Sequence, residues 1–108
     1  MIQVTVYRGS DHITGILIQG HAGYAKYGSD IICAAVSALT LNAFNSIEQF
    51  TDDAFTGQVE EQRGLFELHF SGSVSPNSQL LMDSLILGLQ SIQESYGKKY
   101  IRIRFEEV

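Results

Sequence analysis

The spacing of apolar residues along this 108-residue chain switches between two periods, and the switching limits the folds open to it. Five segments place apolar side chains at every second position, as strands with one buried face do. Two longer segments space them three or four positions apart, as amphipathic helices do. The order β-β-α-β-β-α-β predicts an α+β fold, in which residues 1–108 form one domain with a single sheet packed against two helices.

Capping and turn residues set the boundaries of these elements. Ser29 or Asp30 caps the first helix, and Ser75 followed by Pro76 begins the second, which Gly97 ends. The first half of the first helix is apolar around most of its circumference, which predicts burial between other elements. The expected strands are residues 2–8, 13–21, 55–60, 65–70 and 100–105, with a hairpin turn over residues 61–64; the first helix extends to about residue 50.

Composition narrows the classes of function. Hydrophobic residues make up 44% of the chain, which suits one core and excludes disorder. One cysteine forms no internal disulfide, and we find no signal peptide, membrane-length apolar run or metal-ligand spacing. The net charge is −5, and four cations near the C-terminus are typical of a solubilised edge strand: Lys98, Lys99, Arg102 and Arg104. We expect a cytoplasmic protein without cofactor or metal that binds neither nucleic acid nor membrane.

One cysteine and one histidine form the candidate site. Cys33 follows the helix cap by three or four residues, where the helix dipole and unpaired N–H groups favour a thiolate and could stabilise an oxyanion. His21 closes the second expected strand, and eleven residues allow the chain to turn back to the helix start. An imidazole beside the thiol would take its proton and later protonate a leaving amine. A buried inert cysteine and a structural histidine remain the alternatives.

Two polar residues near the cysteine are candidate supports. Asp30 caps the helix or orients the imidazole, and the two roles are compatible. Ser37 lies one helical turn after Cys33 on the same face. Its hydroxyl bonds a substrate or the thiolate, or it returns a bond to the helix backbone, which we slightly favour.

The loop between the histidine and the helix combines glycines with tyrosines. Gly23 and Gly28 permit backbone angles that other residues resist, and Tyr24 and Tyr27 lie between them. From Ala22 onward this loop is a candidate lid that gates the site, with tyrosines contacting an extended substrate. An ordinary surface connection fits the composition equally well.

Two motifs carry a resemblance to a known family. Residues 20–23 read GHAG and residues 28–37 read GSDIICAAVS. At this separation the motifs resemble the signature of the bacterial ribosomal-processing cysteine proteases, the Prp family, and length and element order fit over the whole chain. The family often has valine in place of Ile32, a conservative change. The resemblance implies an endopeptidase with Cys33 as nucleophile and His21 as general base and acid, acting through a thioester acyl-enzyme, and it strengthens Asp30 and Ser37 as supports.

The resemblance also implies a substrate and an assembly. The family's substrate is a large-subunit ribosomal protein made with a short N-terminal extension, which the protease removes. Members are homodimers, and the loop after the histidine is described as ordering over bound peptide. Two other classes remain open. One is a non-catalytic ribosome-assembly factor that binds the same precursor, and the other is a thiol redox sensor, which with one cysteine would need an intermolecular disulfide.

Overall fold

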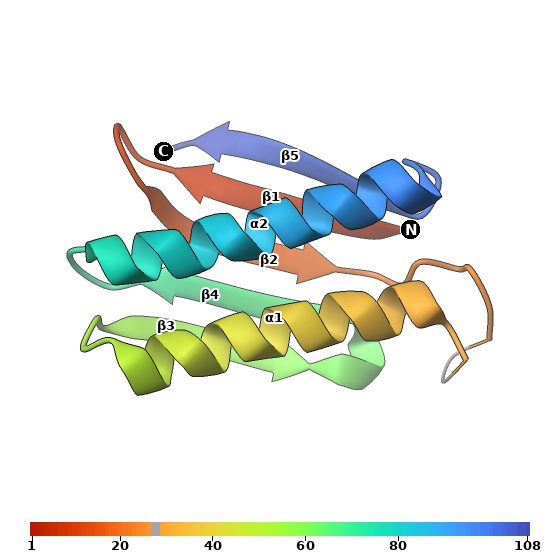
Figure 1. The fold of residues 1–108 in the computed structure, drawn as a ribbon, viewed down its shortest axis with the longest axis horizontal. Coiled ribbons are helices and arrows are strands. Elements are labelled where there is room, and N and C mark those ends of the chain that lie inside the picture. Colours follow the sequence, from red (N-terminus) through yellow and green to blue (C-terminus); the bar gives the residue numbers. More distant parts are fainter. Residues whose placement is uncertain (27–28) are drawn as a thin grey trace.

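The computed structural model describes residues 1–26 and 29–108, and its elements follow the predicted order (Figure 1). The strands pair in the order β3-β4-β2-β1-β5, with β1 and β5 parallel and the other neighbours antiparallel. The elements are β1 (Ile2–Arg8), β2 (Ile13–Gln19), α1 (Ile31–Phe50), β3 (Phe55–Glu60), the short 3-10 helix η1 (Glu61–Arg63), β4 (Leu65–Phe70), α2 (Pro76–Tyr96) and β5 (Ile101–Glu107). The predicted α+β fold with one sheet and two helices is confirmed.

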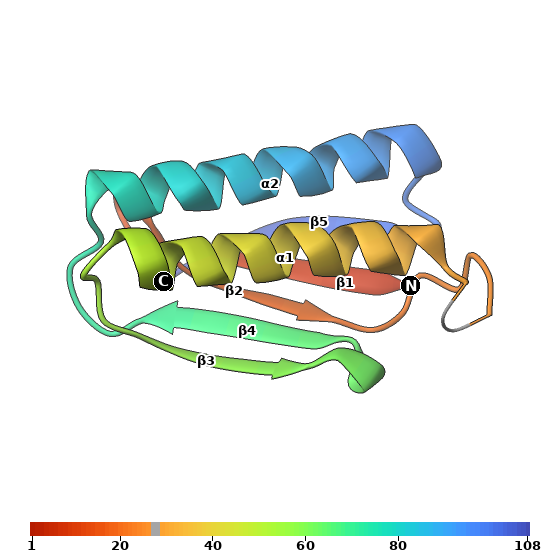
Figure 2. The same cartoon turned by 60° about the horizontal axis from the view of Figure 1, so that its bottom comes forward.

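Both helices cover the same face of the sheet (Figures 1 and 2). Strand residues at alternate positions point into the layer between sheet and helices, where the helices bury one stripe each. The core contains Ile2, Val4, Val6, Ile16, Ile18, Phe66, Leu68 and Ile101 from the strands, and Ile32, Val36, Phe44, Ile47, Met82, Leu85 and Leu89 from the helices. Within residues 1–26 and 29–108, no helix lies on the other face of the sheet (Figure 2).

Helix α1 is less enclosed than its sequence predicts. It packs on the sheet and on α2, while Ile31 and Leu39 stay 52% and 37% exposed, so the expected burial between elements holds for only part of its surface. By length and composition alone α1 could cross a membrane, with a mean hydropathy of 1.4, so the prediction that no apolar segment has membrane length is corrected. In this fold its apolar stripe, including Val36 and Ile47, is buried against the sheet, as in the core helix of a globular domain.

The ends of two strands differ from the prediction. Strand β2 stops at Gln19, because Gly20 has a φ of 99° and turns the chain out of the sheet. A Cβ at Gly20 would lie 2.5 Å from the Met1 carbonyl oxygen, so only glycine fits there. His21 is therefore positioned by a loop and not by strand pairing. Strand β5 continues two residues beyond the expected end, since its parallel pairing with β1 extends to Glu107.

Pairing between β2 and β4 brings η1 to the end of β2. Ile18 lies opposite Phe66 in this register, so the residues after β2 meet the turn that precedes β4. Gly64 ends η1 with a φ of 63°, and a Cβ there would overlap the carbonyl oxygen of Gly20. This close approach joins the hairpin turn to the loop that carries His21.

Candidate active site

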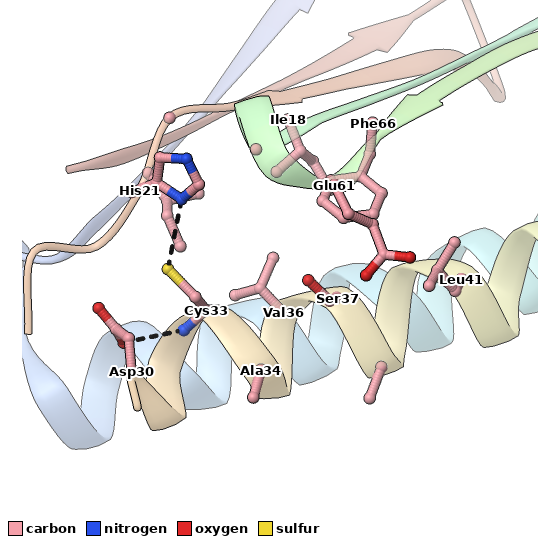
Figure 3. A pocket seen from close by; sticks show the side chains of 14 residues that line it. Ile18, His21, Asp30, Cys33, Ala34, Val36, Ser37, Leu41, Glu61 and Phe66 are labelled. Carbon is pink, nitrogen blue, oxygen red and sulfur yellow. Dashed lines mark hydrogen bonds between the residues drawn. The ribbon is translucent and has the colours of Figure 1, made fainter. Parts of the chain in front are cut away.

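Cys33 and His21 face each other at the start of α1 (Figure 3). The Cys33 Sγ lies 3.9 Å from the His21 Nδ1, and the thiol is partly buried while the histidine is exposed. This separation is long for a hydrogen bond, but such contacts in enzymes without substrate tighten when substrate binds. The structure thus brings together the two residues that the sequence selected.

A backbone carbonyl determines which ring nitrogen faces the thiol. The His21 Nε2 lies 3.0 Å from the carbonyl oxygen of Gln62 in η1. A carbonyl oxygen can only accept a hydrogen bond, so Nε2 carries the hydrogen. In the neutral ring Nδ1 then keeps its lone pair, which faces Sγ. This is the arrangement that a general base for the thiol requires. The sequence did not predict that the Gln62 carbonyl would orient the His21 ring.

The Asp30 side chain connects the start of α1 to the preceding loop through hydrogen bonds. Its Oδ1 accepts the N–H groups of Ile32 and Cys33, both at 3.0 Å, and its Oδ2 accepts those of Tyr24 at 3.0 Å and Ala25 at 3.4 Å. Burial acts to raise the pKa of this carboxyl, but the four backbone hydrogen bonds outweigh it and hold the pKa below its ordinary value. The sequence left two roles open for Asp30, helix cap and orienter of the imidazole, and these contacts are typical of a helix cap.

The thiol does not gain the low pKa that its place on a helix suggests. Burial raises the pKa of Cys33 above that of an ordinary cysteine and the Asp30 carboxylate raises it further, against the lowering effect of the Ala22 N–H, 3.3 Å from Sγ. The expectation of a thiolate produced by the helix start is therefore wrong for this geometry. A thiol that is neutral at rest needs a base to remove its proton when it reacts.

The expected oxyanion donors are also corrected. The N–H groups of Ile32 and Cys33 donate to the Asp30 carboxylate, and that of Ala34 donates to the Asp30 carbonyl at 3.0 Å. These first-turn groups are therefore occupied. The Ala22 N–H, which belongs to the loop and not to the helix, is the backbone donor that points at the sulfur.

A pocket of about 400 Å³ extends from Cys33 along α1 (Figure 3). Its floor is apolar and consists of buried side chains: Ile2, Ile18, Val36 and Phe66. Ser37 and Leu41 continue the helix side, and Glu61 of η1 lies across from them. Such a cleft, apolar with a few polar groups beside a nucleophile, suits a peptide side chain.

Ser37 lines this pocket and does not bond back to its helix. Ser91 in α2 makes such a return bond, to the Leu87 carbonyl at 3.0 Å. Among the hydrogen bonds of residues 1–26 and 29–108, the Ser37 hydroxyl makes no such bond to a helix carbonyl. The alternative that we slightly favoured from sequence is therefore wrong, and the hydroxyl is left to meet a ligand.

The described part of the candidate lid is anchored. Ala22 is buried in the core, and the Tyr24 ring meets those of Tyr96 and Tyr100 edge-on, with centroids 5.8 and 5.3 Å apart. Tyr24 is not among the described residues that line the pocket. Gly23 has a φ of 73°, a backbone angle that residues other than glycine resist, as predicted for this position. The other two residues assigned to the lid, Tyr27 and Gly28, lie outside the described part of the chain.

The sequence of this chain is related to that of a known protein family. Residues 1–102 match the family model of the cysteine protease Prp. A Bacillus subtilis protein named ribosomal processing cysteine protease Prp is 32% identical over 101 residues, which cover 89% of this chain and 90% of that protein. A Staphylococcus aureus protein of the same name is 28% identical over 94 residues, which cover 87% of this chain and 88% of that protein.

A solved structure is similar over the same extent. The crystal structure of an essential ribosomal processing protease Prp from S. aureus, in complex with a covalently linked product peptide, is 27% identical with a TM-score of 0.91. The match covers 98% of this chain and all of that one. Together with the family match over almost the whole sequence, this places the chain in the Prp family of cysteine proteases.

Proposed function

We propose that the protein is an endopeptidase that removes the short N-terminal extension of a large-subunit ribosomal protein, with Cys33 as nucleophile and His21 as general base and acid. The observation that carries the catalytic part is the orientation of the His21 ring, with Nδ1 3.9 Å from Sγ and Nε2 3.0 Å from the carbonyl oxygen of Gln62. The substrate rests on the resemblance described above and on the names of the B. subtilis and S. aureus relatives, which are ribosomal processing proteases.

The reaction proceeds in two steps. Nδ1 takes the thiol proton as Sγ attacks the carbonyl carbon of the scissile bond, and the resulting imidazolium keeps its Nε2–H on Gln62. That imidazolium gives its Nδ1 proton to the leaving amine, which releases the mature ribosomal protein and leaves the extension as a thioester on Cys33. Water, deprotonated by the same nitrogen, then hydrolyses the thioester, frees the extension and restores the thiol.

We assign the oxyanion donor to the Ala22 N–H. This group lies 3.3 Å from Sγ, so it can reach an oxygen on the carbon that the sulfur attacks. Ala22 is buried, and the bonds from Tyr24 and Ala25 to Asp30 fix the backbone that follows it. Asp30 thus acts as a positioning residue for both the nucleophile and this donor. We assign to the Ser37 hydroxyl a contact with bound peptide, because it faces the pocket one turn beyond Cys33.

We also propose that the protein works in the cytoplasm as a homodimer and without a cofactor. The location follows from the substrate, because bacterial ribosomes assemble in the cytoplasm. Leu80 and Leu87 lie seven positions apart on α2 and are 68% and 65% exposed, which offers apolar surface for a second copy to cover. Sedimentation equilibrium tests this assembly, with a mass of twice 11.9 kDa expected and 11.9 kDa contradicting it.

To test the function, the purified protein is mixed with the extended ribosomal precursor, and the masses of the products are measured by mass spectrometry. We expect a single cut by the wild-type protein and none by Cys33→Ala, with the circular dichroism of the two proteins unchanged. Binding without a cut would refute the proposal and favour an assembly factor, and a disulfide-linked adduct without a cut would favour a redox sensor. Cleavage by Cys33→Ala would refute the nucleophile assignment.

A further inference from the structure

The pocket contains a carboxylate that the catalytic steps do not use. Glu61 is the first residue of η1, and its carboxylate is exposed and directed toward the part of α1 between Ser37 and Leu41 (Figure 3). The neighbouring Glu60 pairs with Arg63 at 2.8 Å, but no lysine, arginine or histidine among residues 1–26 and 29–108 pairs with Glu61. Glu61 therefore keeps its negative charge available to whatever occupies the pocket.

The other acidic residue of the pocket cannot play this part. Both oxygens of Asp30 accept backbone N–H groups. The described lining includes no lysine or arginine that would compete with a ligand for Glu61. The net charge of the chain is −5, which favours the approach of a cationic peptide over an anionic one. Position and charge together select a basic ligand group.

The distance along the helix locates that group on the substrate. Ser37 and Leu41 follow Cys33 by four and eight residues, so at about 1.5 Å per residue they lie roughly 6 and 12 Å along the axis from the nucleophile. A peptide extended along the pocket advances about 3.3 Å per residue. From this geometry, and resting on the proposed function, we infer that Glu61 binds a lysine or arginine side chain two to four residues from the cut bond. It acts as a specificity residue and takes no part in the chemistry.

The size of the effect follows from the exposure of the carboxylate. A solvent-exposed ion pair contributes little, which corresponds to about a two- to fivefold change in kcat/KM. Glu61 should therefore select among peptides without being required for cleavage. The effect should also weaken at high salt, because exposed charges are screened.

Cleavage of a proteome-derived peptide library, read by mass spectrometry, tests the inference without a known substrate sequence. The wild-type protein should enrich Lys or Arg at one position two to four residues from the cut. Synthetic peptides that carry Lys, Gln or Glu at that position then give the ratios of kcat/KM. We expect a Lys-to-Gln ratio of about two to five for the wild-type protein, about one for Glu61→Gln, and a preference for Glu in Glu61→Lys.

Glu48→Gln and Glu48→Lys are the matched controls. Glu48 is an exposed glutamate near the far end of α1 and outside the pocket, so these variants change the net charge equally and should keep the wild-type ratio. If the wild-type protein cuts peptides but shows no basic preference, or keeps it in both Glu61 variants, the inference is overturned and the protease proposal stands. If the wild-type protein cuts neither the library nor the precursor, both are overturned.

Discussion

Gly64→Ala should lower stability and activity together, although Gly64 takes no part in the chemistry. A Cβ at Gly64 would overlap the Gly20 carbonyl oxygen and lie 2.9 Å from the Gly20 carbonyl carbon and 3.3 Å from the His21 Cε1. The closest of these are backbone atoms, which cannot rotate away as a side-chain end can. Overpacking costs about 1–3 kcal/mol, and the positive φ of 63° adds about 1–2 kcal/mol for a residue with a Cβ.

The expected loss in the free energy of unfolding is therefore about 2–5 kcal/mol, which should lower the Tm by about 10 °C or more for a domain of this size. Relief of the clash moves the His21 loop away from η1, and a displacement of about 1 Å costs roughly 10²-fold in rate. Circular dichroism melting and kcat/KM for the extended precursor measure the two effects.

Two other glycines separate the causes of this loss. Gly23 has a positive φ of 73° but open space around its Cβ position, so the Tm of Gly23→Ala reports the backbone angle alone. Gly72 has neither constraint, and Gly72→Ala should melt like the wild-type protein. A Gly64→Ala variant that is as stable as Gly23→Ala would show that the close approach between η1 and the His21 loop does not exist.

Four further predictions concern single side chains. Thr40→Val should raise the free energy of unfolding by about 1 kcal/mol in urea titrations, because the fully buried Thr40 hydroxyl has no partner among the described residues; an unchanged value would contradict this. The pKa of Asp30 is lower folded than unfolded, so its stabilisation is present above the unfolded pKa and is lost as the pH falls through the folded one. The free energy of unfolding of the wild-type protein should therefore fall between about pH 5 and pH 2 more steeply than that of Asp30→Asn. Asp52 is exposed, so the control Asp52→Asn should follow the wild-type slope. Parallel pH curves for Asp30→Asn and the wild-type protein would refute the capping role. Because burial raises the pKa of Cys33, its alkylation by iodoacetamide in a His21→Ala background, where no base assists, should accelerate only above the pH range of an ordinary cysteine, and an inflection near neutral pH in that variant would contradict the account. At neutral pH His21→Ala should slow that alkylation and reduce kcat/KM by about 10²-fold or more, and unchanged rates would remove the base.

Local signals in the sequence were enough to predict α1 and its cap. Asp30 caps the helix by accepting hydrogen bonds from the backbone of residues two and three positions later, so the capping pattern can be recognised within a few neighbouring residues. The meeting of Cys33 and His21 could also be predicted, because eleven residues are enough for the chain to turn back to the helix start and the two motifs together resemble a cysteine-protease signature. Whether the first-turn N–H groups of α1 are free or already hydrogen-bonded could not be predicted, because this depends on how the single side chain of Asp30 is oriented.

The contributions of the β3–β4 turn were beyond sequence reasoning. Gln62, Glu61 and Gly64 reach the site only because β2 pairs with β4, and that register joins residues far apart in the chain, such as Ile18 and Phe66. Gln62 acts through its backbone carbonyl, which any residue type would supply. The turn was predicted as a hairpin connection, and its glycine was the one available sign of a close backbone approach.

The measurement that tests the central claim most directly is the intact mass of the wild-type protein, quenched in acid during cleavage of the extended precursor. The account predicts a species heavier by the acyl group of the N-terminal extension, attached at Cys33 and released by hydroxylamine as a thioester is. Turnover without any covalent adduct, or an adduct that also forms in Cys33→Ala, would contradict attack by the sulfur.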